Sequence, residues 1–151
     1  MMKLAHYSSC FFDFDPKYKY LQNAEPHFKP AGFWLSVEGE YGWPEWCKEE
    51  EFLLDGLNHK TEFELTESGN VLHIKSKEEL DDLDRFLPKH NTNRYFVNWT
   101  PIIEDYDGII ISPYRWESRF TVSWYYGWDC ASGCIWNLGS IRTKRYTEAG
   151  I

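Results

Sequence analysis

The sequence predicts an α+β domain, because short segments with strand patterns are interspersed with two or three segments that have helix patterns. Residues 60–65 alternate polar and apolar side chains, as a half-buried strand does, and the β-branched run at residues 109–111 is typical of a fully buried strand. A capping box begins at Ser76, leucines follow at helical spacing, and Pro88 ends the segment, so a helix is predicted there. A length of 151 residues suits a single domain, residues 1–151.

The remaining elements are predicted from similar local signals. Residues 43–52 and 99–106 each carry a proline near the start, which favours two further short helices. Pro16 and Pro26 interrupt residues 10–30, so we expect a long loop there, with a helical turn around residues 18–22. The other strands are expected at residues 3–9, 32–36, 71–74, 119–125 and 134–136.

Charge and composition narrow the function classes. The formal net charge of −8 argues against nucleic-acid binding through a general basic surface, and it is compatible with a basic protein partner. We expect neither a signal peptide nor a membrane span, and therefore a cytoplasmic protein with reduced thiols. Cys130 and Cys134 lack a second close ligand pair, so no metal site is expected.

Two tryptophans are candidates for a binding site because they lie on neighbouring predicted elements. Trp34 is on the strand at residues 32–36, and Trp46 is on the helix that follows. Two indole rings held on rigid elements can form a slot for a flat ring. The alternative is that both are ordinary core residues in a chain with eight tryptophans.

Three motifs taken in order resemble the ADP-ribosyltransferase superfamily, in particular its poly(ADP-ribose) polymerase-like branch. That branch carries a His-Gly-Ser motif on its first strand, where this chain has His6-Tyr7-Ser8. Its second strand and following helix correspond to residues 32–36 and to Trp46-Cys47. Its last strand, followed by a Gln-Ile or Gln-Val pair, corresponds to residues 132–137 and to Ser140-Ile141. The resemblance covers nearly the whole chain with short motifs.

The resemblance implies a split β-sheet core that grips NAD, the co-substrate. His6 would donate a hydrogen bond to a ribose hydroxyl, with Ser8 nearby, and the Tyr7 backbone would pair with the nicotinamide amide. Trp34 and Trp46 would sandwich the positively charged ring, which gains cation–π attraction over indole. Gly32 and Ser36 belong to the same implied NAD-binding strand.

The chain departs from the family where a catalytic glutamate should begin the last strand. The aligned residue is Ser132. Asp129 is the nearest acid and could accept the proton of the acceptor, and Glu117 is the second candidate. A third possibility is that neither carboxylate acts.

The resemblance implies transfer of ADP-ribose from NAD to RNA, DNA or protein by a small toxin or phage-conflict effector, which an antitoxin or chaperone could hold. For a nucleic-acid acceptor, we expect a local basic groove built from Arg115, Arg119, Arg142, Lys144 and Arg145. One alternative is a non-catalytic module of the same fold that binds NAD, ADP-ribose or a protein. Another is an interaction protein whose acidic surface mimics nucleic acid.

Overall fold

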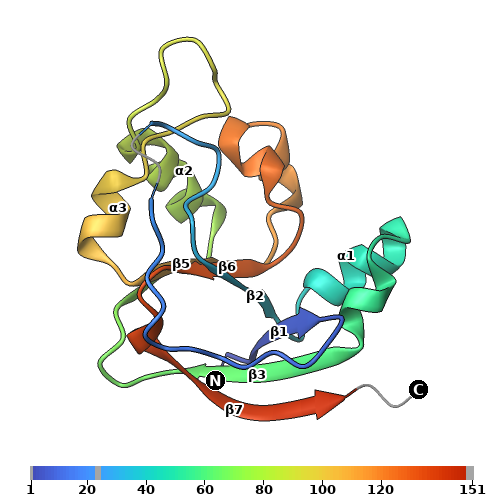
Figure 1. Ribbon diagram of the computed structural model, residues 1–151. Coiled ribbons are helices and arrows are strands. Elements are labelled where there is room, and N and C mark those ends of the chain that lie inside the picture. Colours follow the sequence, from blue (N-terminus) through green and yellow to red (C-terminus); the bar gives the residue numbers. More distant parts are fainter. Residues whose placement is uncertain (1, 23–24, 149–151) are drawn as a thin grey trace.

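The computed structural model describes residues 2–22 and 25–148, and it is a mixed α+β structure built on one open seven-stranded sheet (Figure 1). The strand order is β4-β5-β6-β2-β1-β3-β7. Only β4 and β5 pair in parallel, and all other neighbours are antiparallel. The strands are β1 (Leu4–Ser8), β2 (Phe33–Val37), β3 (His59–Leu65), β4 (Val71–Ile74), β5 (Gly108–Ile111), β6 (Ser132–Ile135) and β7 (Ile141–Glu148).

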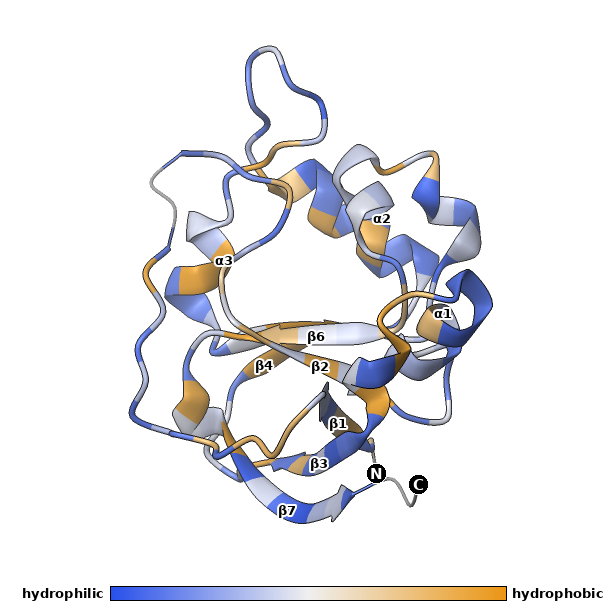
Figure 2. Ribbon diagram, turned by 45° about the vertical axis from the view of Figure 1, so that its right-hand side comes forward, coloured by the Kyte–Doolittle hydropathy of each residue, from blue (hydrophilic) through white to orange (hydrophobic). Residues whose placement is uncertain are grey.

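Three α-helices and four short 3₁₀ turns complete the described part of the chain. The helices α2 and α3 lie over β5 and β6, whereas α1 lies beside β1 and β3 (Figure 1). Hydrophobic residues gather in the central strands and on parts of α2 and α3, while β7 is largely hydrophilic (Figure 2). The helices are α1 (Trp43–Glu50), α2 (Lys77–Phe86) and α3 (Thr100–Asp105), and the 3₁₀ turns are η1 (Leu54–Leu57), η2 (Trp116–Arg119), η3 (Ser123–Gly127) and η4 (Leu138–Ser140).

The helix α2 forms for the reasons that its sequence predicts. The Ser76 hydroxyl caps it by accepting a hydrogen bond from the Glu79 backbone N–H at 3.1 Å. Leu80 and Leu83 are buried against the sheet. The indole N–H of Trp124 donates to Asp84 at 3.0 Å, which ties η3 to the helix. A large part of the apolar core therefore lies between β5, β6 and this helical layer, and the core continues to β1, β2 and β3 through Leu4, Phe33 and Phe63.

The junction between β1 and β2 is the shortest pairing in the sheet. It consists of Leu4 opposite Val37 and Ala5 opposite Ser36. In contrast, β1 pairs with β3 over its whole length, and β2 pairs with β6 through four residues. The backbones of β1 and β2 therefore diverge beyond Ala5, and a space opens between them.

Several predictions from local sequence are wrong. The segment 119–125 was expected as a strand, but it lies across the 3₁₀ turns η2 and η3. The segment 18–22 is not helical, and a turn at residues 15–18 takes its place. The last strand was placed at residues 134–136, but β6 covers 132–135 and β7 follows it. The family resemblance, in addition, implies a split pair of sheets, whereas the structure has one hydrogen-bonded sheet with a short junction at its middle.

Within residues 2–22 and 25–148, none of the helices has the length and apolar content needed to span a membrane.

Candidate functional site

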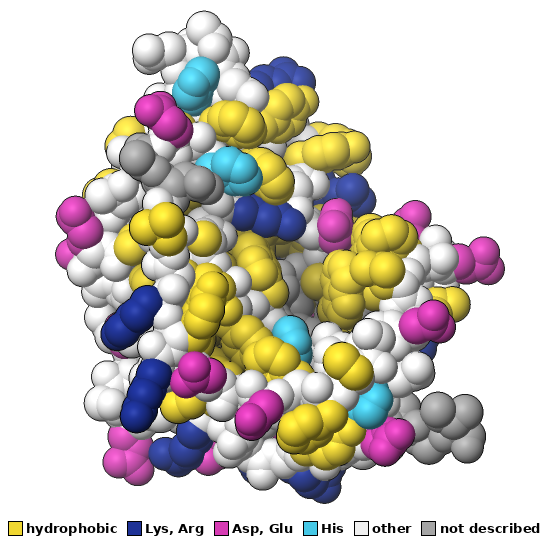
Figure 3. Space-filling model, in the orientation of Figure 1, with side chains coloured by type: hydrophobic (Ala, Val, Ile, Leu, Met, Phe, Trp, Pro, Cys, Tyr) yellow, Lys and Arg dark blue, Asp and Glu magenta, His cyan; other side chains and the backbone are white. Residues whose placement is uncertain are grey.

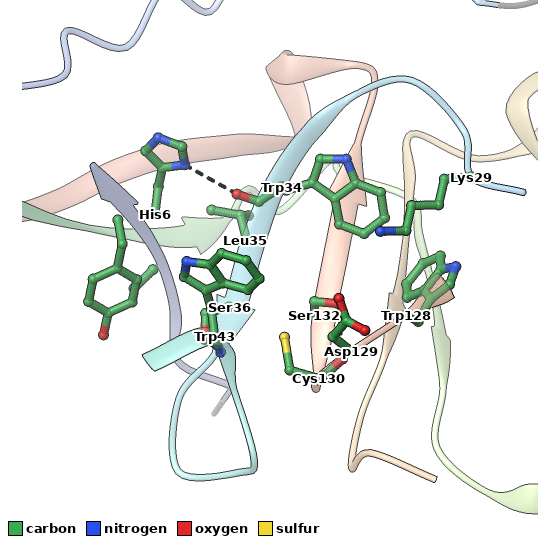
Figure 4. A pocket seen from close by; sticks show the side chains of 12 residues that line it. His6, Lys29, Trp34, Leu35, Ser36, Trp43, Trp128, Asp129, Cys130 and Ser132 are labelled. Carbon is green, nitrogen blue, oxygen red and sulfur yellow. Dashed lines mark hydrogen bonds between the residues drawn. The ribbon is translucent and has the colours of Figure 1, made fainter. Parts of the chain in front are cut away.

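A cavity of about 340 Å³ lies where β1 and β2 diverge, beside the start of β6. Its volume falls near the lower end of the range of small-molecule sites, roughly 300–1,000 Å³. Figure 4 shows Trp43 on one side, Lys29, Trp34 and Trp128 on the other, and Asp129 with Cys130 between them. The cavity is lined by Ala5, His6, Tyr7, Lys29, Trp34, Leu35, Ser36, Trp43, Trp128, Asp129, Cys130 and Ser132.

His6 spans the opening between the two diverging strands. Its Nδ1 lies 3.2 Å from the Trp34 carbonyl oxygen, and its ring stacks on Phe33 with centroids 4.5 Å apart. A carbonyl only accepts hydrogen bonds, so Nδ1 carries the proton and Nε2 of the neutral ring is an acceptor. Burial lowers the pKa of His6, which the bond to Trp34 partly offsets. A neutral His6 would therefore accept a hydrogen bond at Nε2, whereas the sequence predicted a donor.

A hydrogen-bond network around Glu38 holds the β1 side of the cavity in place. The Tyr7 hydroxyl donates to one oxygen of this carboxylate, and the Lys60 ammonium lies 3.0 Å from the same oxygen. Ser36 donates to the other oxygen at 3.2 Å, and its own oxygen accepts the Trp43 backbone N–H at 2.9 Å. Burial and the neighbouring Glu38 raise the pKa of Tyr7, so its hydroxyl stays protonated. The network links β1, β2, β3 and the start of α1.

Aromatic rings and one ammonium group form the opposite wall. The rings of Trp34 and Trp128 meet edge to face, with centroids 5.0 Å apart. The Lys29 Nζ lies 5.1 Å from the centroid of the Trp34 ring, which is cation–π distance. In this wall, the positive charge of Lys29 therefore lies over the face of the Trp34 indole ring.

Asp129 places a carboxylate next to this ammonium group. Burial raises the pKa of Asp129, and the positive charges of Lys29 and Arg119 oppose that rise. Burial lowers the pKa of Lys29, and Asp129 opposes that fall. A half-buried carboxylate with a raised pKa in a cavity is a suitable proton acceptor.

Six of the residues predicted from the sequence line the cavity together. These residues are His6, Tyr7, Trp34, Ser36, Asp129 and Ser132. Ser132 begins β6, but its hydroxyl donates to the Cys130 carbonyl oxygen at 3.1 Å.

The other four predicted residues are not among those that line the cavity. The Ser8 hydroxyl donates to the Cys10 carbonyl, and Glu117 is exposed with its carboxylate 3.7 Å from Arg115. Gly32 is packed tightly against β6, where a Cβ would lie 2.5 Å from the Cys134 sulfur. Trp46 stacks on Trp43, with centroids 5.0 Å apart.

The residues that sequence reasoning missed lie close in the chain to those it found. Trp43 lies one helical turn before Trp46, and this spacing alone could not decide which ring faces the strand. Trp128 and Cys130 flank Asp129. Lys29 precedes β2 in the chain, and its position in the sequence does not indicate that its ammonium group lies against the Trp34 ring.

The expected basic groove does not form as one surface. Arg142 and Arg145 lie on β7 and pair with Glu64 and Glu62 of β3, each at 2.7 Å. Arg115 and Arg119 lie at η2, over the opposite part of the sheet (Figure 1). The two arginines of β7 are therefore neutralised at the sheet edge.

No family model, curated protein or solved structure matches this chain. Among the residues that the structure describes, no group of three or more His, Cys, Asp or Glu side chains is placed to hold a metal ion.

Proposed function

We propose that the chain is an ADP-ribosyltransferase that moves ADP-ribose from NAD to a macromolecular acceptor. The observation that carries this proposal is the meeting of His6, Trp34 and Asp129 in one cavity. These residues come from β1, from β2 and from the segment just before β6, and the three strands are consecutive neighbours in the sheet. The family resemblance assigns its three motifs to strands in the same chain order.

The cavity residues fit the nicotinamide riboside portion of NAD. The indoles of Trp34 and Trp43 offer flat apolar faces, and the volume of about 340 Å³ suits a nucleoside-sized group. The position of the Lys29 ammonium against Trp34 supports the idea that this face accepts positive charge. His6 would accept a hydrogen bond from a ribose hydroxyl through Nε2.

NAD would supply a glycosidic bond whose cleavage releases neutral nicotinamide and leaves the ribose carbon to bond with an acceptor nucleophile. The side chains of this protein would position both reactants and take up one proton. Asp129 would receive the proton that the nucleophile loses, because its raised pKa suits it to this role. The Lys29 ammonium would hold Asp129 ionised before that transfer.

The test is incubation of the protein with labelled NAD and, separately, RNA, DNA and protein extract. Label should be retained on one acceptor class, and Asp129→Asn should lower the rate about 100-fold or more. Glu117→Gln is the matched control, because Glu117 is exposed and lies outside the cavity lining, and it should leave the rate unchanged. Equal loss in both variants, or no loss in either, would remove Asp129 from the mechanism.

A second candidate is a module that binds NAD or ADP-ribose without transferring it. The specific observation in its favour is Ser132, a hydroxyl at the start of β6 where the resemblance calls for a glutamate. Thermal stabilisation by NAD without transfer to any acceptor would favour this candidate. Growth arrest on expression in bacteria, relieved by Asp129→Asn, would favour the toxin form of the transferase.

A further inference from the structure

The segment after α1 exposes three consecutive large apolar side chains. Phe52, Leu53 and Leu54 are 46%, 59% and 47% exposed. Phe52 packs edge to face on Trp46, with centroids 5.5 Å apart, and Trp46 stacks in turn on Trp43. Single exposed apolar residues are common, but a continuous patch of them marks an interaction surface. We call Trp46, Phe52, Leu53 and Leu54 the apolar patch.

The backbone under the apolar patch is held in an unusual conformation. Glu51 has φ 53° and Leu53 has φ 48°, and they are the only non-glycine residues with positive φ in the described chain. Bulky L-residues rarely adopt this left-handed region, and such strain tends to occur where function requires it. The strained turn keeps Leu53 on the surface, although it does not itself identify a ligand.

An acidic rim surrounds the apolar patch. Residues 45–55 contain five acidic side chains and one basic one, Lys48. Figure 3 shows apolar side chains over α1 with acidic side chains around them, next to the hollow in this face. The acids are Glu45, Glu49, Glu50, Glu51 and Asp55, all exposed and none of them in an ion pair among the described residues.

We propose that the apolar patch binds a partner protein through a segment in which apolar side chains are flanked by lysine or arginine. The charge of the acidic rim indicates which class of molecule binds the apolar patch. Nucleic acid and anionic lipid surfaces would be repelled by the five carboxylates. A second copy of the chain would place two acidic rims opposite each other across a symmetric interface. A basic amphipathic segment complements both the apolar centre and the rim.

The apolar patch lies beside the mouth of the cavity, so a partner bound to the patch would be next to the cavity. Trp43 both lines the cavity and stacks on Trp46 of the patch. A segment seated on Trp46 would therefore lie against the wall that Trp43 forms. Docking at this patch does not depend on the transferase activity and is tested without NAD.

The experiment selects binders of the wild-type protein from a displayed library of random peptides about 16 residues long, and then measures the affinity of the selected peptides for the wild type and for a patch variant. The variant Leu53→Asn with Leu54→Ser removes two apolar side chains from the patch, and asparagine tolerates the left-handed conformation at position 53. Selected peptides should be enriched in leucine or phenylalanine flanked by lysine or arginine. Their affinity should fall at least about tenfold on the variant, and should also fall as salt screens the rim.

Two further variants test the acidic rim separately from the apolar patch and provide a control. Glu50→Lys changes only the rim and should weaken the same peptides, while Leu21→Ser removes a side chain that is 93% exposed elsewhere and should leave binding unchanged. Selected peptides that are acidic or uncharged, or that bind the patch variant equally well, would overturn the proposal. Self-association abolished by Leu53→Asn, or binding to anionic vesicles, would also overturn it by assigning another occupant.

Discussion

At the scale of single residues, His6 shows most clearly how burial sets chemistry. Its Nδ1 is committed to the Trp34 carbonyl, and its ring is enclosed by Phe12 and Phe33. Burial lowers its pKa from the ordinary value of 6.5, so the ring is neutral near pH 7. The fold thereby selects both the charge and the tautomer that reach the cavity.

The lowered pKa of His6 predicts a specific loss of stability in acid. Below pH 6.5 the unfolded chain binds a proton at this residue that the folded chain does not, so stability falls until the pH reaches the folded-state pKa. Denaturant unfolding at about pH 7 and pH 5 should show a larger loss for the wild type than for His6→Gln. His73, whose pKa burial also lowers, is unchanged in both proteins. Equal losses would mean that His6 titrates normally in the folded state.

Removal of the large apolar side chain of Leu53 should not lower the stability of the protein, unlike the removal of a buried one. Leu53 is 59% exposed and has φ 48°, so Leu53→Gly loses little packing and relieves a left-handed leucine. We expect the melting temperature to stay the same or rise, corresponding to about 0–1 kcal/mol of added stability. A clear fall in melting temperature would show that the Leu53 side chain stabilises the folded protein through packing, contrary to this expectation.

Residue patterns could predict much of the site because its motifs are short and local. The family resemblance, which rests on short motifs in chain order, assigns His6, Trp34 and Asp129 to the site, and all three line the cavity. The choice between Trp43 and Trp46 could not be made, because both lie on the same helical face. Which ring meets the strand depends on how α1 docks, and the bond from the Trp43 backbone to Ser36 sets that docking.

At the scale of elements, close packing between neighbouring strands explains Gly32, the one glycine that the family resemblance assigned to the NAD-binding strand. A Cβ on Gly32 would lie 2.5 Å from the Cys134 sulfur and 2.8 Å from the Ile135 carbonyl oxygen. Gly32 therefore allows the chain entering β2 to approach β6. Its role in the site is to place Trp34, two residues later, against the cavity.

Substitution of Gly32 should therefore act through packing. Gly32→Ala should cost about 1–3 kcal/mol of unfolding free energy, because the backbone carbonyl in its way cannot rotate aside. Gly56→Ala is the matched control, since its nearest neighbour is an ordinary 3.9 Å away, and it should be close to neutral. Both are measured by urea unfolding. Similar stabilities for the two variants would contradict the close approach of β2 to β6.

Elements with strong local signals could be predicted, and elements that depend on pairing could not. The cap of α2 and the buried run of β5 are visible in the sequence. In β7 only Ile141 is buried, so the strand has no apolar alternation to recognise. Its order comes from backbone pairing with β3, which extends from Ile141 to Glu148. The aromatics of residues 119–125 mimic alternation but pack from 3₁₀ turns.

At the scale of the whole molecule, the charged side chains that the structure describes are paired in one region and unpaired in another. The arginines of β7 are balanced by carboxylates of β3 at one edge of the sheet, where exposed pairs add little stability. Part of the acidic excess lies around α1, near the cavity mouth. Residues 45–55 carry five acidic side chains and one basic one, so this segment accounts for −4 of the net charge of −8.

The distribution of thiols gives a test of the packing as a whole. Cys10 is exposed, whereas Cys47, Cys130 and Cys134 are buried and burial raises their pKa values, that of Cys130 to about 12. A thiol reagent should label Cys10 quickly in the native protein and all four cysteines after unfolding. Cys10→Ser should abolish the fast phase. Rapid labelling of a second cysteine would show that the cavity opens widely enough to admit the reagent to Cys130.

The order of the strands along the chain has a consequence for biosynthesis. In the sheet, β1 lies between β2 and β3, and β7 pairs with the outer edge of β3. The part of the sheet that carries His6 is therefore complete only after β7 has been synthesised. Asp129 also leaves the ribosome long after His6. A nascent chain would therefore carry no finished cavity until translation has passed β7.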